Sequence, residues 1–532
     1  MQNSTIFDPI LERKKSPRLA LTASVGLTEL EIKIIDTREF QRLRTIKQLG
    51  TSYLVYPSAD YSRFEHSLGT LHVASIMVQK IKLNEYNSLT EKNIPALDEQ
   101  IIRLAALLHD ITHVPFGHTL EDETAIIKKH EEDEERFNYF FQQSDLGKVL
   151  KDNLEENQYK RLIRILRTER KDVDTLGGDA YISDIVKNTV CSDLLDYIRR
   201  DTSYCDLYER IGDMFLNYLY IAEHPPDSGV RRLVLRLWKG KFREGRSWPR
   251  LDLLSEMRDL LRVRFSLGQK VYFHHTKIIT SAMVSRAVQE VKKSLISGDD
   301  HKLWKIGDEV LLELLEKSGN KVAEKLSSNL RSRKLHKRCY TLSYLRTKEA
   351  LGEEWQDYII DNYHKKPDYR KQEEDRLAGL SDLEPGDVLI YCPSEDMQLK
   401  QADMLITWKG NIKRLRDLTE KDDDLTYRDI KLTLDSHQNL WSLQVFVKSD
   451  VSKNKMEDLT TCCRATFEPT VRDTPRETYL RSAVTRVAHR AIRKQGKDLN
   501  RLDEVVEKIM EECNRLSYNI TIQKIEEISQ SF

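Results

Sequence analysis

The sequence contains few of the residues that interrupt helices. Of its 532 residues, 20 are glycine and 13 are proline, about half of their usual combined share. This scarcity excludes a collagen-like or low-complexity chain and favours a helical one. Charged residues make up 32% and hydrophobic residues 39% of the chain, a balance typical of solvated helices that pack along buried seams.

Membrane-spanning and secretory signals are also missing. No apolar run approaches the roughly 20 residues that cross a bilayer, and the opening residues MQNSTIFDPILERKKSP lack the apolar core of a secretory signal. The seven cysteines include no Cys-x-x-Cys motif, which argues against a zinc ribbon or a disulfide scaffold. We therefore expect a reduced, cytoplasmic protein without a membrane partner.

The chain has no excess of one charge. Lysine plus arginine number 86, as do aspartate plus glutamate, so binding to nucleic acid through overall charge is excluded. Two local basic clusters remain, at residues 239–250 and 331–338. Such runs usually form solvated faces, but these two are also candidates for binding an effector triphosphate or single-stranded nucleic acid.

Hydrophobic periodicity predicts helices along most of the chain. The segments expected to be helical are 30–35, a helix opening near His66, the almost wholly apolar 101–108, 133–170, 181–200, much of 250–350, and the tail 476–532. The charged run 363–379 predicts an exposed connector. Three segments rich in β-branched and aromatic residues, 387–392, 402–408 and 441–447, predict short strands.

Histidine is concentrated in one part of the chain. Six of the 14 histidines lie within residues 66–130, and the pair His109–Asp110 ends the apolar helix 101–108. A metal ion would satisfy these buried polar groups, because imidazole and carboxylate suit Mn, Fe, Zn or Ni, and carboxylate also suits Mg. Alternatively, backbone groups could satisfy the hydrogen-bonding needs of His109 and Asp110. The nearby His113 and His118 make this alternative less favourable. His72 is expected to point elsewhere.

Three motifs occur in a specific order: RFEHSLG (63–69), LLHDITHVPFGH (107–118) and SDLLDYIRRD (192–201). Together they resemble the signatures of the HD-domain deoxynucleoside triphosphate triphosphohydrolases. DPI (8–10), IIDTREFQRLRTIKQLG (34–50) and VYFHHTKIITSAMV (271–284) are similar to the same family. The resemblance covers about residues 7–290, with a weaker echo over 387–450, and no SAM-domain sequence precedes it.

The resemblance implies an active site. The matched metal ligands are His66, His109, Asp110 and Asp193. The matched catalytic residues are His113 and His118 beside the α-phosphate, Glu121 as their acidic partner, and His130. Glu121 stands where the family has an aspartate, and the residues that follow His130 depart from the family pattern.

The resemblance also implies a substrate site and an effector site. The residues matched to substrate contacts are Gln48, Arg63, Tyr197, Asp201, Arg264 and Tyr272. A lysine expected after the metal-binding aspartate is replaced by Leu194, which removes a contact to phosphate. The residues matched to an activating guanine nucleotide between subunits are Asp36, Gln41 and Arg44. The alternative for Asp36 is an N-cap of the helix that carries Phe40 and Leu43.

We therefore expect a mainly α fold, with an HD-domain helical body and a smaller mixed α/β C-terminal lobe. The expected division is a lead-in with the effector segment (1–40), the HD domain (41–300), a helical extension with a charged connector (301–385) and the α/β lobe with its tail (386–532). The implied reaction is metal-dependent hydrolysis of a dNTP to deoxynucleoside and inorganic triphosphate, with nucleotide activation, a homo-oligomer (tetramer or hexamer) and antiviral dNTP depletion as further implications. The alternatives are a slow nucleotide sensor that regulates a partner protein, and an HD nuclease.

Overall fold

The structure of the protein is a computed structural model. It describes residues 17–515 apart from positions 20, 22, 85–93, 131, 240–247, 297–301, 346, 348–352, 395–403, 421, 423, 469–474 and 495–501. Helices dominate, which confirms the expected mainly α fold. The DPI tripeptide, most of the basic cluster 239–250 and the last residues of the tail lie outside the described residues.

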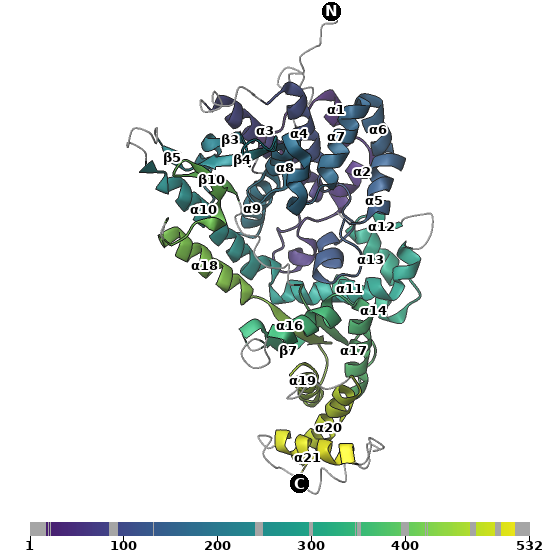
Figure 1. The fold of residues 1–532 in the computed structure, drawn as a ribbon. Coiled ribbons are helices and arrows are strands. Elements are labelled where there is room, and N and C mark those ends of the chain that lie inside the picture. Colours follow the sequence, from purple (N-terminus) through teal and green to yellow (C-terminus); the bar gives the residue numbers. More distant parts are fainter. Residues whose placement is uncertain are drawn as a thin grey trace, which may run out of the picture.

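The N-terminal two thirds of the chain form a helical body (Figure 1). Its helices up to the third motif are α1 (Glu29–Ile35), α2 (Arg38–Gln41), α3 (Arg63–Leu83), α4 (Ala96–Leu108), α5 (Glu134–Asn138), α6 (Asp145–Asn153), α7 (Glu156–Arg167), α8 (Ala180–Lys187) and α9 (Ser192–Tyr204). They are followed by α10 (Leu251–Leu267), α11 (His275–Ile296), α12 (Lys302–Lys305), α13 (Asp308–Glu316) and α14 (Lys321–Arg331).

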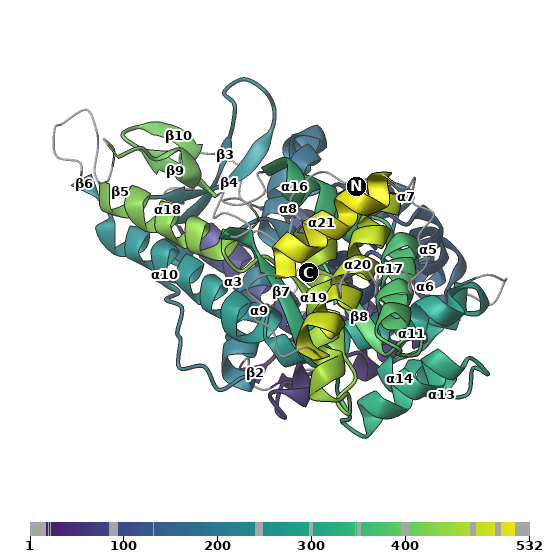
Figure 2. The ribbon, with the colours of Figure 1, turned by 90° about the horizontal axis from the view of Figure 1, so that it is seen from below.

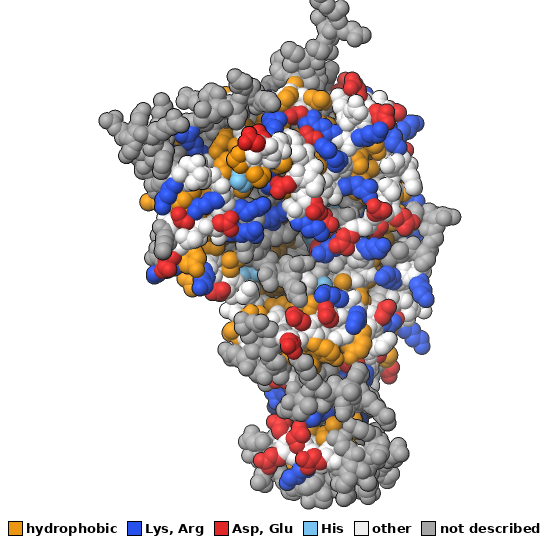
Figure 3. Space-filling model, viewed as in Figure 1, with side chains coloured by type: hydrophobic (Ala, Val, Ile, Leu, Met, Phe, Trp, Pro, Cys, Tyr) orange, Lys and Arg blue, Asp and Glu red, His pale blue; other side chains and the backbone are white. Residues whose placement is uncertain are grey.

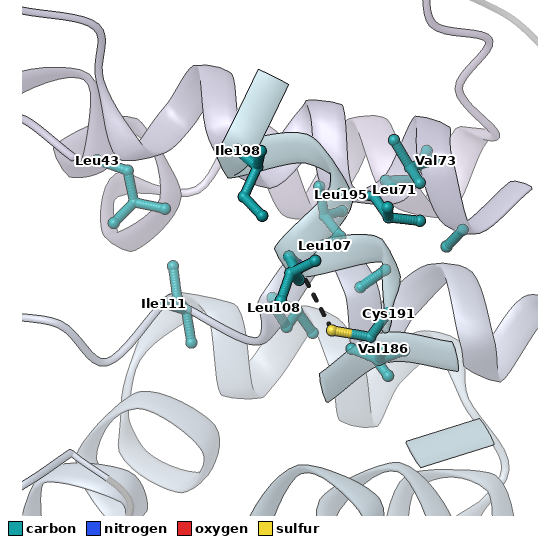
Figure 4. Packing of buried hydrophobic residues seen from close by; sticks show 14 of the residues in the cluster. Leu43, Leu71, Val73, Leu107, Leu108, Ile111, Val186, Cys191, Leu195 and Ile198 are labelled. Atoms are coloured by element: carbon teal, nitrogen blue, oxygen red, sulfur yellow. Dashed lines mark hydrogen bonds between the residues drawn. The ribbon is translucent and has the colours of Figure 1, made fainter. Parts of the chain in front are cut away.

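Helix α3 packs against both α4 and α9 in this body. Ser62 caps α3 by accepting a hydrogen bond from the Glu65 backbone N–H, and Cys191 caps α9 in the same way. Leu71, Leu107 and Leu195 are fully buried where the three helices meet (Figure 4). The motifs that begin α3, end α4 and begin α9 are therefore brought to one place.

The described residues form four small sheets, of which two are two-stranded: β1 (Arg18–Leu19) pairs with β2 (Ala23–Ser24), and β5 (Trp238–Lys239) pairs with β6 (Trp248–Pro249). The two larger sheets lie on the body and in the lobe. One has the order β10 (Asn411–Arg414), β9 (Leu405–Trp408), β4 (Arg231–Arg236), β3 (Leu219–Glu223), with β4 and β9 parallel. The other is antiparallel, with β11 (Ser442–Val447) between β7 (Lys337–Ser343) and β8 (Val388–Tyr391). The three predicted strands are confirmed as β8, β9 and β11, whereas β3, β4 and β7 were not predicted.

The C-terminal lobe has its own hydrophobic core. Helices α16 (Glu353–Ile359), α17 (Pro367–Leu380) and α19 (Lys453–Phe467) pack around the antiparallel sheet, and α18 (Asp424–Gln438) runs beside α10 (Figures 1 and 2). The prediction of an exposed connector over 363–379 is wrong, because helix α17 occupies most of this stretch. Its Arg370 and Glu374 side chains are buried, and ion pairs and hydrogen bonds satisfy their charges. Helices α20 (Pro475–Lys494) and α21 (Leu502–Arg515) extend beyond α19.

The surface carries both charges. Lysine and arginine side chains alternate with acidic ones across the face in Figure 3. The basic cluster 331–338 links α14 to β7, and its Arg331 forms ion pairs with Glu309 and Glu316. Among the described residues, no helix is long and apolar enough to cross a membrane.

Candidate functional site

The histidines and carboxylates of the three motifs converge at the junction of α3, α4 and α9. His66 Nε2 lies 3.3 Å from His109 Nε2 and 3.1 Å from Asp193 Oδ1. Asp110 Oδ1 lies 3.4 Å from His109 Nε2, and Asp110 Oδ2 lies 3.8 Å from His66 Nε2. The structure thus brings together all four residues that the resemblance implies as metal ligands.

The orientation of the two imidazoles fits a bound cation. His109 Nδ1 lies 2.8 Å from the Ala106 carbonyl oxygen, and His66 Nδ1 lies 2.8 Å from Asp196 Oδ2. With both Nδ1 atoms donating, the two Nε2 lone pairs point at one another across 3.3 Å. Two facing lone pairs repel unless a positive charge lies beside them, and an outer hydrogen bond that fixes the tautomer is typical of histidine metal ligands.

The electrostatics of this group also favour a positive charge. Although burial opposes a charge on His66, hydrogen bonds to Asp193 and Asp196 raise its pKa to about 10, so a proton on Nε2 is favoured at the position that a metal ion would otherwise take. Burial likewise opposes ionisation of Asp193, but hydrogen bonds with His109 and His66 hold its pKa below the ordinary value. HD domains bind divalent metals, and His66, His109 and Asp193 have atoms close enough to share one.

Asp196 is held in place by its own partners. Arg200 Nε donates to Asp196 Oδ2 at 2.8 Å, and Arg200 Nη1 donates to Glu65 Oε1 at 2.5 Å. Asp196 and Arg200 lie one turn apart on α9, whereas Glu65 and His66 are adjacent on α3. Both helices therefore contribute to fixing the His66 ring.

A second group of histidines and a carboxylate lies beside the first. His113 Nε2 is 3.3 Å from Asp110 Oδ1, and its Nδ1 is 3.4 Å from Glu121 Oε2. His130 Nδ1 lies 3.0 Å from the same Glu121 oxygen. Arg136 Nη1 donates to Glu121 Oε1 at 2.5 Å. The glutamate thus contacts two histidines on one oxygen while an arginine holds the other.

His113 is kept uncharged. Burial, followed by the positive charges of Arg63 and His130, lowers the pKa of His113 to about 4. His118 differs, because its side chain is 50% exposed and forms an ion pair with Asp122 at 2.8 Å. The His113 and His118 ring centroids lie 4.8 Å apart. His118 is therefore the accessible histidine beside a buried one.

The residues matched to substrate contacts lie around Asp201. Tyr61 and Tyr272 each donate a hydroxyl hydrogen bond to this buried carboxylate, both at 2.5 Å. Burial raises the pKa of Asp201 to about 6. The Tyr197 ring centroid is 6.5 Å from that of His66, so the polar residues around Asp201 adjoin the first group.

The other three matched residues differ in their surroundings. Arg264 is buried and interacts electrostatically with Tyr197. Gln48 Oε1 is buried and makes no hydrogen bond within the described part of the chain. Arg63 Nη1 donates to Asp110 Oδ2 at 2.5 Å, so this arginine also supports the first group. Leu194, which replaces the expected lysine, is buried in the hydrophobic core.

The segment implied as an effector site is organised by hydrogen bonds within the chain. Gln41 Nε2 donates to the Ile35 carbonyl at 2.8 Å, and Arg44 Nε donates to Gln41 Oε1 at 2.8 Å. The Arg44 guanidinium lies 3.5 Å from the Phe64 ring centroid. Asp36 follows the last turn of α1. The suggestion that it caps the next helix is wrong, because the Thr37 side chain caps α2.

Sequence reasoning missed several residues that support these groups: Tyr61, Asp122, Arg136, Asp196 and Arg200. Asp196 could have been found, because its spacing of three from Asp193 places both on one face of a helix. Arg136 could not, since its pairing with Glu121 depends on how the chain between them folds. His72 takes no part in either group.

Two family models match the chain. The HD domain matches residues 63–201 and the HD associated region matches residues 257–462. A solved structure of a hypothetical protein from Aquifex aeolicus has a TM-score of 0.56 and 21% identity, over 83% of this chain and 99% of that one. At this identity the likeness shows a shared fold.

Curated relatives include proteins with and without an assigned activity. An uncharacterized protein of Methanocaldococcus jannaschii is 30% identical over 328 residues, 62% of this chain and 60% of the relative. The deoxynucleoside triphosphate triphosphohydrolase SAMHD1 of Gallus gallus is 25% identical over 423 residues, 70% of this chain and 65% of the relative. A SAMHD1 homolog of Dictyostelium discoideum is 28% identical over 324 residues, 57% of this chain and 55% of the relative. The chain thus spans less than two thirds of each.

Proposed function

We propose that this chain, which matches the models of the HD domain and of the HD associated region, hydrolyses dNTPs to deoxynucleoside and inorganic triphosphate. The observation that carries this proposal is the contact between the two groups, with His113 Nε2 3.3 Å from Asp110 Oδ1. Potential metal ligands and potential proton-transfer residues then act on one phosphorus atom. The relatives named as dNTP triphosphohydrolases support the choice of substrate.

The proposed metal ligands are His66, His109, Asp110 and Asp193. A divalent cation there would neutralise phosphate charge and lower the pKa of water, as Mn, Fe, Mg, Zn or Ni does to different extents. Asp196 orients His66 through the 2.8 Å hydrogen bond, and Arg63 holds Asp110 through its 2.5 Å contact. Asp196 and Arg63 thus hold the proposed ligand atoms close together, whichever metal ion the protein binds.

His118 is proposed as the group that protonates the departing 5′-oxygen. Its ring is half exposed, and the Asp122 carboxylate 2.8 Å from Nδ1 holds the ring in position for proton transfer. His113 and His130 share Glu121, which fixes the position of their rings. Arg136 donates a hydrogen bond to the other Glu121 oxygen and so holds the carboxylate in place. In this proposal, His118 transfers the proton at the solvent-accessible edge of the buried group formed by His113, Glu121 and His130.

The polar residues around Asp201 are proposed to hold the deoxyribose. Tyr61 and Tyr272 fix the carboxylate, and the Tyr197 ring, 6.5 Å from that of His66, is proposed to exclude a ribose 2′-hydroxyl. Arg264 is proposed to contact phosphate, since a guanidinium fork suits phosphate oxygens. Gln48, with its buried Oε1 still available, is proposed to face the sugar.

Product analysis tests the reaction. The purified protein is incubated with each dNTP and with Mn²⁺ or Mg²⁺, and the products are resolved by chromatography. Deoxynucleoside with inorganic triphosphate is expected. Formation of dNMP or dNDP would contradict the proposal, cleavage of single-stranded DNA would indicate a nuclease, and tight dNTP binding with negligible turnover would indicate a nucleotide sensor.

Activation by a second nucleotide is a finer part of the proposal. Asp36, Gln41 and Arg44 are proposed to bind a guanine nucleotide between subunits of a homo-oligomer, because an aspartate accepts from the N1 and N2 hydrogens of guanine and an arginine reaches phosphate. The Arg44–Phe64 contact links this segment to α3. Control of the dNTP pool, with an antiviral effect, would follow from such an enzyme.

A further inference from the structure

The turn of helix that carries Glu121 and Asp122 is held from outside the motifs. This π-helix, η4 (Thr119–Glu123), follows His118 directly. Its side chains contact α11: Thr119 Oγ1 lies 3.2 Å from Ser281 Oγ, Thr124 Oγ1 lies 2.8 Å from Ser285 Oγ, and Glu123 pairs with Lys277. The turn that carries the partners of His118 and His130 is therefore attached to α11 by the residues that flank them.

The backbone at the end of η4 is held by the C-terminal lobe. Arg370 of α17 donates from Nη2 to the Thr124 carbonyl at 2.8 Å and from Nη1 to the Tyr363 carbonyl at 2.9 Å. Arg370 is 3% exposed and Thr124 is 2% exposed. A carbonyl at the end of a helix has no partner within the helix, and burial without a donor is costly. Arg370 supplies that donor.

Arg370 belongs to a rigid connection between α11, α17 and β8, which lie together in Figure 2. Arg286 of α11 donates to Glu374 at 2.6 Å and to Asp375 at 2.7 Å. The other Glu374 oxygen accepts from the Ile390 N–H of β8 at 2.8 Å. The side chains of η4 contact α11 and the backbone at its end contacts α17, and these two helices are joined to each other. Movement of the lobe should therefore move the proton-transfer residues.

We propose that the C-terminal lobe positions the His118–Asp122 and His130–Glu121 pairs through Arg370, and that Arg370 is a positioning residue for catalysis. The inference rests on the proposed function for the chemistry, but the mechanical link is independent of the substrate. Arg370 and Arg286 make their hydrogen bonds with the Thr124 and Tyr363 carbonyls and with Glu290, Glu374 and Asp375, and none of these residues belongs to the proposed metal ligands or to the group around Asp201. Loss of Arg370 should therefore lower kcat and leave KM and metal content unchanged.

The test compares Arg370→Met and Arg370→Lys with Arg376→Met. Arg376 lies on the same helix but faces Glu373 and Thr466 of the lobe, so it controls for general loss of lobe stability. Arg370→Met is expected to reduce kcat by about tenfold or more and to speed hydrogen–deuterium exchange over residues 118–124. Arg370→Lys should recover part of the turnover and part of the protection from exchange, since lysine keeps one hydrogen-bond donor. Arg376→Met should change neither.

The outcomes separate this inference from the proposed function. If the wild type releases no triphosphate from a dNTP, turnover of a chromogenic phosphodiester replaces kcat, and exchange over 118–124 is read in the same variants. A folded Arg370→Met protein with wild-type exchange and wild-type turnover would overturn the inference. An equal response in Arg376→Met would also overturn it, because the effect would then be general destabilisation. If Arg370→Met does not fold, the same comparison is made with Arg370→Lys.

Discussion

At the scale of single residues, the site combines buried groups whose positions are fixed with one exposed histidine. His66, His113 and Glu121 are buried and contact charged partners on several sides. His118 is half exposed and has one ion pair, to Asp122. A substitution at His118 should therefore change the chemistry without disturbing the packing.

His118→Ala is expected to lower dNTP turnover by about 10² or more, as for the loss of an acid–base residue. Binding of dNTP should change little, and the melting temperature should stay close to that of the wild type. His72→Ala is the matched control, because His72 lies on α3 outside both groups. Initial rates, isothermal titration and thermal melting on one preparation check the prediction. A lowered melting temperature with normal turnover would assign His118 a structural role.

At the scale of helices, the site depends on how closely α3 and α9 approach. A Cβ at Gly69 would lie 2.0 Å from Asp196 Oδ1 and 2.4 Å from Arg200 Nη2. Because Asp196 orients His66, a methyl group there would displace the support of a proposed metal ligand. The glycine is required by side chains that face it, and not by an unusual backbone angle.

Gly69→Ala is expected to reduce bound metal and to lower the melting temperature. Gly379→Ala is the control, because Gly379 is also helical but has nothing within 4 Å of a built Cβ; alanine there should stabilise the protein by up to about 1 kcal/mol. Elemental analysis and thermal melting measure the two effects. Wild-type metal content in Gly69→Ala would show that the Asp196–His66 contact does not govern metal binding.

The sequence predicted the elements that carry strong periodicity or an ordered motif. The apolar stretch 101–108 predicted α4, and the motifs predicted which histidines and carboxylates meet. Strand β7 was missed because its residues, KRCYTLS, begin within a basic cluster. The many charges of residues 363–379 predict a solvated connector, whereas in helix α17 Arg370 and Glu374 are buried against partners far away in sequence. Pairing over such distances leaves no local signal.

At the scale of the whole molecule, the lobe contains buried histidines that burial keeps neutral. Burial lowers the pKa of His336 and that of His364 to about 4 each, from 6.5. His336 Nε2 lies 3.0 Å from the Gly386 carbonyl, and His364 Nδ1 lies 3.0 Å from the Cys392 carbonyl. The charged groups that act on them are Lys325, Asp387 and Asp450 for His336, and Arg370, Lys129 and Asp122 for His364.

The lobe should therefore lose stability in acid. A histidine with a lowered pKa in the folded state contributes fully above pH 6.5, and its contribution falls as the pH drops towards 4, because the unfolded chain takes up protons first. The double variant His336→Gln, His364→Asn keeps amide nitrogens near the two bonded ring nitrogens and removes the titration. Its melting temperature should fall less than that of the wild type between pH 7 and pH 4.5. Parallel curves for the two proteins would contradict the prediction.

Regulation through assembly is the last prediction at this scale. Arg44 is an exposed cation that contacts Gln41 and the Phe64 ring, and Phe64 stands between Arg63 and Glu65 at the start of α3. A nucleotide phosphate that draws Arg44 towards a neighbouring subunit would therefore act on the helix that carries His66. A coupling of about 1–3 kcal/mol is typical of such linkage.

Turnover at fixed dNTP is expected to rise with GTP or a second dNTP, together with a shift to a tetramer or hexamer in sedimentation. Arg44→Ala should abolish that rise and leave the rate without added nucleotide unchanged, since the side chain contacts neither histidine group. Lys33→Ala is the matched control, because Lys33 is an exposed cation of α1 that contacts Glu29 and Asn153. Activation that survives in Arg44→Ala would place the effector elsewhere, and unchanged mass and rate across all nucleotides would leave residues 36–44 a structural segment that packs against α3.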